Sequence, residues 1–240
     1  MSKKSLLYNN DKIDEIYNIL KNTFLFQDLD EESLKNIIQE CKLVTFKKNE
    51  TVDSDIAKND LFIILKGRIK IMHIDPHTGR SLAIFLKSIG EIFDIFTLLD
   101  NKEHTVFPIF MDNVITLKIP TQRAREWICK YPNFNKNFLP YLGEKMRKLE
   151  NFGTSLVFHN TTIRLANLIL KHTYPHKIED HYPVTLINNL SHESLAELIG
   201  SVRSVVSTQM QKLKENGIII SKRGKLEVKD LKKLIDLCDE

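Results

Sequence analysis

Hydrophobic positions near the start of the chain recur every three or four residues, which is the spacing of one face of a helix. Residues 11–22 are predicted to form one amphipathic helix. Its apolar side consists of Ile13, Ile16, Ile19 and Leu20. A second helix is expected over residues 31–41, because the Asp30 carboxylate can cap its first turn.

Between residues 43 and 119 the pattern changes to short runs rich in β-branched and aromatic residues. The runs cover residues 43–46, 61–65, 69–72, 82–86, 106–110 and 114–119. Turn-forming sequences separate them, such as the DPHTG stretch at residues 75–79. Many short strands at this spacing predict a jelly-roll-like β-barrel, which can hold one small ligand between its walls. The apolar residues 92–99 fit either a short helix or irregular structure.

A single long helix is predicted over residues 133–158, after a short helix at 123–131 that Pro132 ends. Its apolar stripe packs either on the chain's own barrel or on the same helix of a second copy. The second alternative is favoured, because so long a helix has more apolar edge than a small barrel covers. Gly143 and Gly153 each cost the helix about 1 kcal/mol relative to alanine, and close approach of a partner helix would explain them. The candidate dimer residues are Phe138, Leu142, Met146, Leu149 and Phe152.

A helix is predicted over residues 162–172, capped by Asn160, and a strand over residues 184–187. The stretch 190–217 follows, and its pattern predicts two helices joined by a tight corner. Ser191 can cap the first helix, and Gly200 can end it in a left-handed conformation. The expected inner face of the second helix consists of Val202, Val205, Val206, Met210 and Leu213. This is the pattern of a helix-turn-helix, whose second helix enters the major groove of DNA.

The outward face of the second helix carries short polar side chains around one long cation, which suits the reading of base edges. The base-reading candidates are Arg203, Ser204, Ser207 and Thr208. Strands at 218–220 and 226–228 around a basic turn predict a wing. The candidate phosphate contacts are Ser191, His192, Lys212, Lys222, Arg223 and Lys225. The alternative is an ordinary helical hairpin with a solvated basic face.

Composition adds bounds to this picture. A chain of 240 residues suggests two domains. Its net charge is only +4, yet residues 200–225 hold six Lys or Arg against one acidic residue, so the positive charge is local, as in a DNA footprint. No apolar run approaches the roughly 20 residues that span a bilayer, and the N-terminus lacks the features of a secretion signal. A cytoplasmic protein without a membrane partner is expected.

The order of these parts resembles the Crp/Fnr family of bacterial transcription regulators over nearly the whole chain. The resemblance is carried in the barrel by DLFIILKGRIKI, DPHTGR and Gly90-Glu91-Ile92-Phe93, and after it by TTIRLANLIL and LSHESLAELIGSVRSVVSTQMQKLKENGII. It implies an α+β fold with an N-terminal jelly-roll-like β-barrel of the cyclic-nucleotide-binding type, a long dimerisation helix and a C-terminal winged helix-turn-helix. The corresponding domains are 1–132 for the N-terminal helices and effector-sensing barrel, 133–159 for the dimerisation helix and 160–240 for the winged-helix DNA-binding domain.

The resemblance also implies the partners: double-stranded DNA, a second copy of the chain and RNA polymerase. A homodimer would grip two half-sites about 34 Å apart. The family's recognition helix usually starts Arg-Glu-Thr-Val and carries a second Arg. Arg203 matches the first Arg and favours a guanine contact. The usual family operator is not expected, because Ser204, Val205 and Thr208 replace the Glu, the Thr and the second Arg.

Cyclic-AMP-binding members of the family hold the ribose and the cyclic phosphate with a Gly-Glu pair and a following Arg-Ser or Arg-Thr. Here Ile95 replaces the Glu and His104 falls near the Arg position. Binding of a cyclic nucleotide is therefore not expected. Oxygen-sensing members hold an iron–sulfur cluster with an amino-terminal cysteine cluster, which this sequence lacks, so that cofactor is not expected either.

The signal is thus expected to be a small one other than a cyclic nucleotide, which would reposition the recognition helices. A haem that senses a diatomic gas and an apolar small molecule both stay open, and the cofactor is unknown. Candidate axial ligands of a haem are His73, His77, His104 and His159. Candidate effector-pocket residues are Phe85, Phe93, Phe96, His104, Phe107 and Leu149, whose aromatic rings fit a plain core equally well.

Two other classes of function have weaker support in the sequence. A barrel enzyme with a DNA-binding tail is remote, because no His-x-His pair, Ser-His-Asp set or paired carboxylates stand out. No enzymatic activity and no metal site are expected, since the sequence also lacks a Cys-x-x-Cys pair. An effector-independent or thiol-controlled regulator of the same fold is the other alternative, with Cys129 as the candidate thiol. Cys41 and Cys238 are expected to be incidental.

Overall fold

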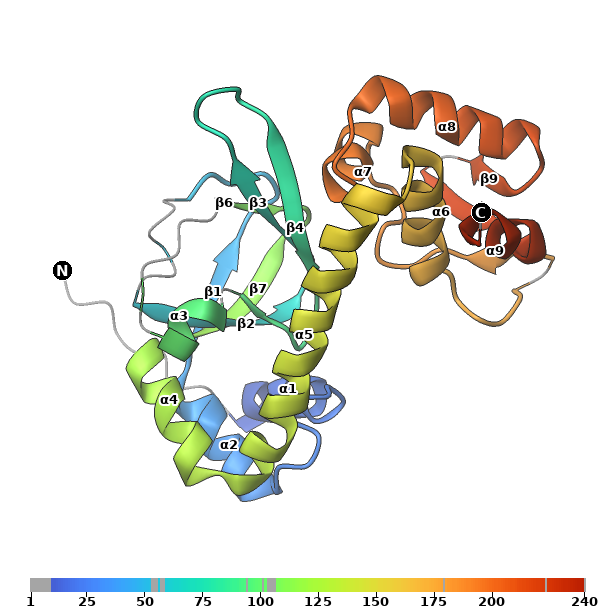
Figure 1. Ribbon diagram of the computed structural model, residues 1–240. Helices are drawn as coiled ribbons and strands as arrows, with labels where there is room; N and C mark the ends of the chain where they lie inside the picture. The colour runs from blue at the N-terminus through green and yellow to red at the C-terminus, as the bar shows by residue number, and fades with distance from the viewer. Residues whose placement is uncertain are drawn as a thin grey trace. The chain divides into compact units, whose positions relative to one another are not determined.

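The computed structural model describes residues 10–52, 56, 59–93, 95–100, 102, 107–178, 180–222 and 224–239 (Figure 1). The chain divides into two compact units. The first unit comprises residues 1–73 and 84–147, and the second comprises residues 74–83 and 148–240. Within the described residues, the helices are all too short or too polar to cross a membrane.

The first unit combines short helices with two sheets. Its helices are α1 (Asn10–Lys21), α2 (Glu31–Glu40), α3 (Ile95–Asp100), α4 (Thr121–Lys130) and the first part of α5 (Pro132–Phe158). Its strands are β1 (Lys42–Phe46), β2 (Asp60–Lys66), β3 (Ile69–Ile74), β4 (Ser81–Lys87), β5 (Ile92–Phe93), β6 (Phe107–Phe110) and β7 (Val114–Pro120). The predicted strands and the predicted long helix are therefore confirmed to within a few residues.

Among the described residues the strands form two sheets, which agrees with the predicted jelly-roll-like arrangement, although the two sheets do not join into a closed barrel. One sheet has the order β1-β7-β2-β5, and the other has the order β4-β3-β6. In the first sheet β2 pairs antiparallel with β7, so that Leu61 lies opposite Ile119 and Ile63 opposite Leu117. The two sheets pack face to face, because residues of both sheets share one buried apolar cluster.

Strand β2 explains how the unit is layered. Alternate side chains of a strand point to opposite faces, and β2 is buried on both. Phe62 and Ile64 enter an inner cluster between the sheets. Leu61, Ile63 and Leu65 enter a second cluster beneath the helices. The uninterrupted apolar run of β2 is what a strand buried on both faces requires.

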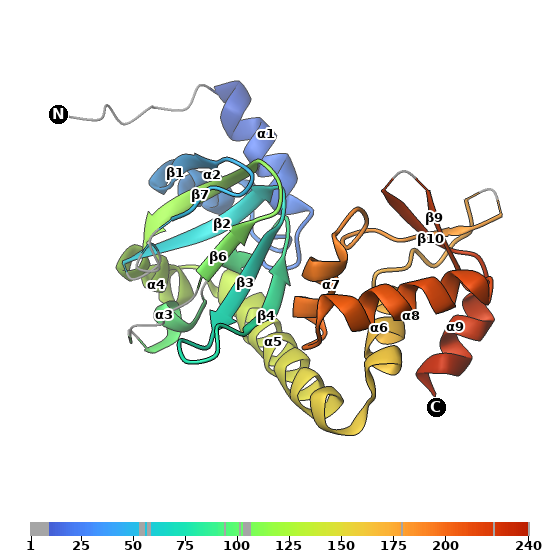
Figure 2. The ribbon, with the colours of Figure 1, turned by 90° about the horizontal axis from the view of Figure 1, so that it is seen from above.

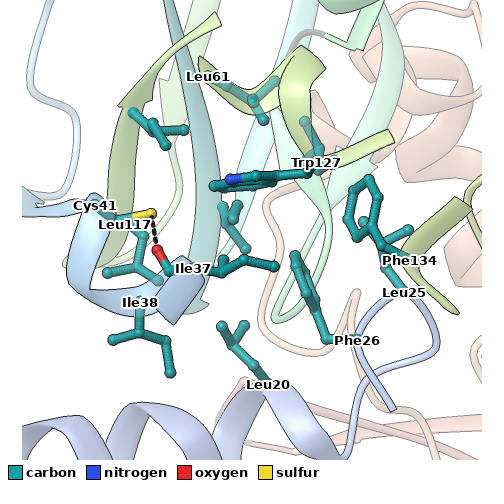
Figure 3. Close-up of a cluster of buried hydrophobic side chains, with 14 of the residues drawn as sticks. Leu20, Leu25, Phe26, Ile37, Ile38, Cys41, Leu61, Leu117, Trp127 and Phe134 are labelled. Atoms are coloured by element: carbon teal, nitrogen blue, oxygen red, sulfur yellow. Dashed lines mark hydrogen bonds between the residues drawn. The ribbon is translucent and has the colours of Figure 1, made fainter. Parts of the chain in front are cut away.

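The helix-side cluster contains most of the large buried side chains (Figure 3). The Trp127 indole lies among residues from α2, β2 and β7, and its Nε1 donates to Glu40 Oε2 at 3.2 Å. The Phe134 ring lies 5.9 Å from Trp127 and 5.7 Å from Phe26, measured between ring centroids. Through Phe134, the start of α5 is anchored in the core of its own chain.

The second unit carries the carboxy-terminal elements (Figure 2). They are α6 (Thr161–Lys171), β8 (Tyr182–Pro183), α7 (His192–Leu198), α8 (Arg203–Glu215), β9 (Ile219–Lys222), β10 (Lys225–Val228) and α9 (Leu231–Cys238). The predicted cap of α6 is confirmed, since Asn160 Oδ1 accepts from the Ile163 N–H at 3.1 Å. Helix α9, which sequence reasoning did not predict, packs against α6.

The strand predicted over residues 184–187 is wrong. Val184 makes an isolated bridge to Thr173 and donates its N–H to the Leu226 carbonyl at 3.2 Å, and the residues after Thr185 turn. The Thr185 N–H donates to the His172 carbonyl at 2.8 Å, and the Asn188 N–H donates to the Thr185 carbonyl at 2.9 Å. The three-stranded sheet β8-β10-β9 therefore takes its third strand from Tyr182–Pro183.

Candidate nucleic-acid interface

Helix α7 and the turn after it fix the position of the helix that follows. The Ser191 Oγ accepts from the Ser194 N–H at 3.1 Å and caps α7, as predicted. After α7, Gly200 has a φ of +62°. A Cβ atom there would lie 2.6 Å from Leu156 Cδ2, so any other residue would meet both backbone strain and a clash. This glycine makes the close corner between α7 and α8 possible.

Helix α8 has one buried side and one broad exposed side. The buried side chains are Val206, Met210 and Leu213, which are at most 3% exposed. All four base-reading candidates lie on the exposed side, together with the two polar residues that follow them. These exposed residues are Arg203, Ser204, Ser207, Thr208, Gln211 and Lys212. The fold thus presents a broad, mostly polar exposed side on α8, as a groove-reading helix requires.

Two valines of α8 are exposed, although the sequence pattern placed them on the inner face. Val202 is 60% exposed and Val205 is 37% exposed, so that part of the prediction is wrong. Successive residues of a helix are about 100° apart, and the buried side is centred on Val206. Val205 is therefore turned outward, and Val202 is the N-cap residue, outside the helix itself.

The candidate phosphate-contacting residues differ in their exposure, their existing hydrogen bonds and their charge. Lys212 and Lys225 are exposed. The Ser191 hydroxyl already accepts the cap bond and donates to Ser194 Oγ at 3.3 Å. Lys222 lies in β9, and Arg223 lies outside the described residues. Burial, followed by the nearby charges of Lys214 and Arg203, lowers the pKa of His192, so this residue offers an N–H group without a charge at neutral pH.

Arg164 is a residue that sequence reasoning missed. Its Nη1 donates to the Leu156 carbonyl at 3.3 Å, and its Nη2 donates to the Gly200 carbonyl at 3.4 Å. The same Nη2 lies 3.4 Å from Thr161 Oγ1. One guanidinium therefore joins the last turn of α5, the start of α6 and the corner of the helix-turn-helix. The only sequence signal was a lone cation inside the apolar TTIRLANLIL segment.

Comparison with known proteins agrees with this geometry. Residues 163–237 match the model of the Crp-like helix-turn-helix domain. The CRP-like cAMP-activated global transcriptional regulator of Mycobacterium tuberculosis is 22% identical over 202 residues, which are 84% of this chain and 90% of that protein. The chain thus carries a Crp-like helix-turn-helix domain and is similar over most of its length to CRP-like transcription regulators.

Solved structures show the same fold. The structure of a CooA mutant from Carboxydothermus hydrogenoformans has a TM-score of 0.75 and 20% identity, and the alignment covers 91% of this chain and 97% of that one. A CRP/FNR family transcriptional regulator from Thermus thermophilus has a TM-score of 0.63 and 21% identity, with 83% and 99% covered. The Crp/Fnr fold thus extends beyond the helix-turn-helix to the sheets and α5.

The structure places the candidate effector residues in different environments. The Phe93 ring is 2% exposed and lies 5.8 Å from the Phe62 ring, inside the cluster between the sheets. Phe85 packs against that cluster, whereas Phe96 is 37% exposed. Phe107 and Leu149 are half-buried, and His104 lies outside the described residues. Phe93 is therefore part of the hydrophobic core, which was one of the two roles expected for these aromatic residues; the other was to line an effector pocket.

The candidate dimer residues on α5 also divide. Phe138 is 2% exposed and packs in the helix-side cluster of its own chain, so we remove it from the set. Leu142, Leu149 and Phe152 are half-buried, and Met146 is 70% exposed. The first turns of α5 thus pack on their own unit, and the exposed apolar side chains of the helix lie on a different side from Phe138.

Proposed function

We propose that the chain is a homodimeric, sequence-specific regulator in which α8 of each copy reads one half-site. The observation that carries the proposal is the division of α8 into a buried apolar side and an exposed side that begins with Arg203. Arginine donates two parallel bonds to guanine O6 and N7 in the major groove. The lysines of α8 and of the wing add phosphate contacts that hold the register without reading sequence.

The test is binding of the full chain to a promoter fragment, measured by gel shift with Arg203→Ala. We expect the specific complex to weaken by about 5- to 150-fold, because a good bidentate contact contributes about 1–3 kcal/mol. The matched control is Arg123→Ala, which removes the same charge from an exposed position on α4. Equal binding by Arg203→Ala, Arg123→Ala and the unaltered chain would contradict the proposal.

Dimerisation is assigned to an exposed seam on α5. Leu139, Met146 and Gly153 are seven residues apart, as are Gly143, Glu150 and Val157, and this repeat places all six on one side of a helix. Leu139 is 64% exposed, Met146 70% and Val157 75%. Among the described residues, nothing lies within 4 Å of a Cβ built on Gly153, so this chain alone does not require a glycine there. A partner helix that approaches closely would require it.

Sedimentation velocity tests this seam. Met146→Glu places a charge in the centre of the seam and is expected to yield monomers at concentrations where the unaltered chain is dimeric. Asn151→Glu is the matched control, because Asn151 is exposed on α5 but lies well to one side of the seam. Dimers that resist Met146→Glu would place the interface elsewhere.

The signal is proposed to be a small molecule other than a cyclic nucleotide. The mycobacterial relative is named as cAMP-activated, but Ile95 stands where the resemblance places a ribose-binding Glu. Ile95 is 5% exposed and belongs to the helix-side cluster, so it contributes apolar packing and no hydrogen bond. For a ligand to reset the recognition helices, it must bind one arrangement of the dimer more tightly than the other.

Two measurements separate the classes of signal. A ligand at about a hundred times its Kd stabilises a protein by about 2.7 kcal/mol, so cyclic AMP at millimolar concentration should leave the melting temperature unchanged. A rise of several degrees in the melting temperature would show that cyclic AMP binds and would overturn this part of the proposal. The absorption spectrum of protein purified without oxygen then decides between haem, which gives a Soret band, and an apolar ligand, which does not.

Thiol control of the same fold is a second candidate, because Cys129 on α4 is exposed. Cys41 contrasts with it: burial, together with the charge of Glu40, raises the pKa of this thiol and keeps it protonated. Oxidation that abolishes DNA binding in the unaltered chain but not in Cys129→Ser would support this candidate. Equal loss in both proteins would remove it.

A further inference from the structure

The fold of the chain does not explain why two exposed valines lie at the start of α8. Val202 is 60% exposed and Val205 is 37% exposed, so the fold leaves part of each apolar side chain uncovered. Valine is also a weaker helix former than alanine, because its side chain is restricted against the preceding turn. Val205 lies beside the base-reading candidates, on the surface that enters the groove in the proposed function.

Thr208 extends this apolar surface. Its Oγ1 donates to the Ser204 carbonyl at 3.1 Å, so the only hydrogen of the hydroxyl is used within the helix. What remains for a partner is the methyl group and the acceptor lone pairs of the oxygen. Residues three apart on a helix are neighbours, so Val205 and Thr208 together form a short strip of methyl groups, which we name the methyl strip.

We propose that the methyl strip of Val205 and Thr208 contacts the C5-methyl group of a thymine in the major groove. The inference deepens the proposed function and rests on it. In the major groove, thymine is the one base that presents a methyl group, and apolar side chains recognise it by contact. A serine hydroxyl can donate to or accept from a base edge, so it pairs with several bases. Ser204 and Ser207 therefore cannot distinguish thymine from the other bases.

The position of the thymine follows from helix geometry. The rise per residue is about 1.5 Å, so the methyl strip begins about 3 Å and ends about 7.5 Å beyond Arg203 along the helix. Stacked base pairs are about 3.4 Å apart. The thymine should therefore lie within about two base pairs of the guanine that Arg203 reads.

The experiment begins with selection of binding sites from random duplex DNA by the full chain. Each thymine of the selected half-site is then replaced singly by uracil, which removes only the methyl group, and Kd is measured by fluorescence anisotropy at constant salt. Burial of one methyl-sized group contributes about 0.8 kcal/mol, which is roughly a fourfold change in Kd. We expect this loss at one thymine beside the guanine.

The variants assign the loss to the methyl strip. Val205→Ala should bind the thymine and uracil duplexes with Kd values within about 1.5-fold of each other. Thr208→Ser keeps the hydroxyl bond to Ser204 and should lose part of the preference. Gln211→Ala is the matched control and should keep all of it, because the Gln211 amide donates to Glu215 within α8 at 2.9 Å. Circular dichroism melting confirms that these exposed substitutions leave the fold intact.

Each outcome is decisive. A selected consensus that the unaltered chain binds equally with thymine or uracil at every position overturns the inference and leaves the proposed function standing. A full thymine preference in Val205→Ala overturns the assignment to Val205. If selection yields no consensus, the proposed function itself fails, and the inference fails with it.

Discussion

The Lys145 ammonium lies against the Glu91 carboxylate, which ties α5 to the loop between β4 and β5. The Lys145 side chain is 7% exposed and that of Glu91 is 20% exposed, so water screens the pair only weakly. The Ser88 N–H donates to the other carboxylate oxygen at 2.9 Å. The neighbouring Tyr141 hydroxyl accepts from the Ile92 N–H at 3.1 Å. These bonds hold the helix and the loop in a single register.

Removal of one partner of this pair should destabilise the first unit. Lys145→Met leaves the Glu91 carboxylate buried with one cation fewer, and we expect the free energy of unfolding to fall by about 3 kcal/mol. Glu91→Gln combined with Lys145→Met should recover much of that loss, since neither charge is then left without the other. Urea denaturation of the two single variants and the double variant measures the coupling. A coupling energy near zero would show that the two groups do not interact.

The same pair should make stability depend on pH. Burial alone would raise the pKa of Glu91, but the charges of Lys87 and Lys145 outweigh it, and the pKa lies below the ordinary value of 4.5. A carboxyl group whose pKa is lowered on folding stabilises the protein above its unfolded pKa and loses that contribution as the pH falls through the folded pKa. The contribution of this pair to stability should thus be constant from pH 7 to about 5 and decline below about 4.5.

The measurement is the free energy of unfolding between pH 3 and 7, for the unaltered chain and for Glu91→Gln. The difference between the two proteins should shrink toward acid pH, because only the unaltered chain has this group to titrate. Asp112 also makes stability depend on pH, because the hydrogen bond from Arg68 lowers its pKa. Since both proteins keep Asp112, it adds the same pH dependence to the free energy of unfolding of each, and its effect cancels in the difference. Parallel curves would contradict the assignment of the effect to Glu91.

Local signals in the sequence predicted much of this structure, and contacts between distant segments account for the rest. Asp30 was identified as a cap because capping depends on adjacent residues, and its Oδ1 accepts from Ser33 at 2.8 Å. Residues 184–187 alternate like a strand, but bonds to and from the turn at Thr185 decide otherwise. The partners Glu91 and Lys145 are 54 residues apart, and nothing local links them.

The sequence predicted the residues of the candidate site, but it did not predict which side of α8 is buried. Arg203 and Thr208 were placed correctly on the outer side of α8, since polar residues rarely face a core. A run of valines does not reveal which of its members is buried. Val206 is fully buried and Val205 is not, because the phase is set by packing against α7 and α6. The same ambiguity placed Phe138 on a dimer face, although it belongs to the core.

Arg164 should couple the fold of the second unit to DNA binding. Arg164→Lys keeps the charge, but one ammonium cannot span the carbonyls of Leu156 and Gly200 as a guanidinium does. We expect a loss of about 1–3 kcal/mol in stability, as for other partly buried hydrogen-bond networks. DNA affinity should also fall, with the dimer intact. Thermal unfolding and gel shift of Arg164→Lys, with Arg123→Lys as the control, measure both effects; unchanged DNA affinity would limit Arg164 to a structural role.

The corner of the helix-turn-helix can be tested with two glycines that share a backbone conformation. Gly200 has a φ of +62° and Gly217 a φ of +67°. Among the described residues, a Cβ atom would have no neighbour within 4 Å at Gly217, but would lie 2.6 Å from Leu156 Cδ2 at Gly200. Gly217→Ala should therefore cost only the left-handed strain, about 1 kcal/mol. Gly200→Ala should cost about 1–3 kcal/mol more, which is typical of overpacking.

A third variant separates strain from collision at this corner. Combined with Leu156→Ala, the Gly200→Ala substitution should lose the main collision and keep the strain, together with a tight contact of 3.3 Å to Leu82 Cδ1. The cost of adding Ala at 200 should therefore fall most of the way to that measured at 217. The free energy of unfolding in urea is measured for the unaltered chain, the three single variants and the double variant. Equal costs for Gly200→Ala and Gly217→Ala in the unaltered background would mean that α5 does not pack against the corner in solution. In that case the link from α5 through Leu156 to the start of α8 would be absent, and Arg164 alone would have to carry it.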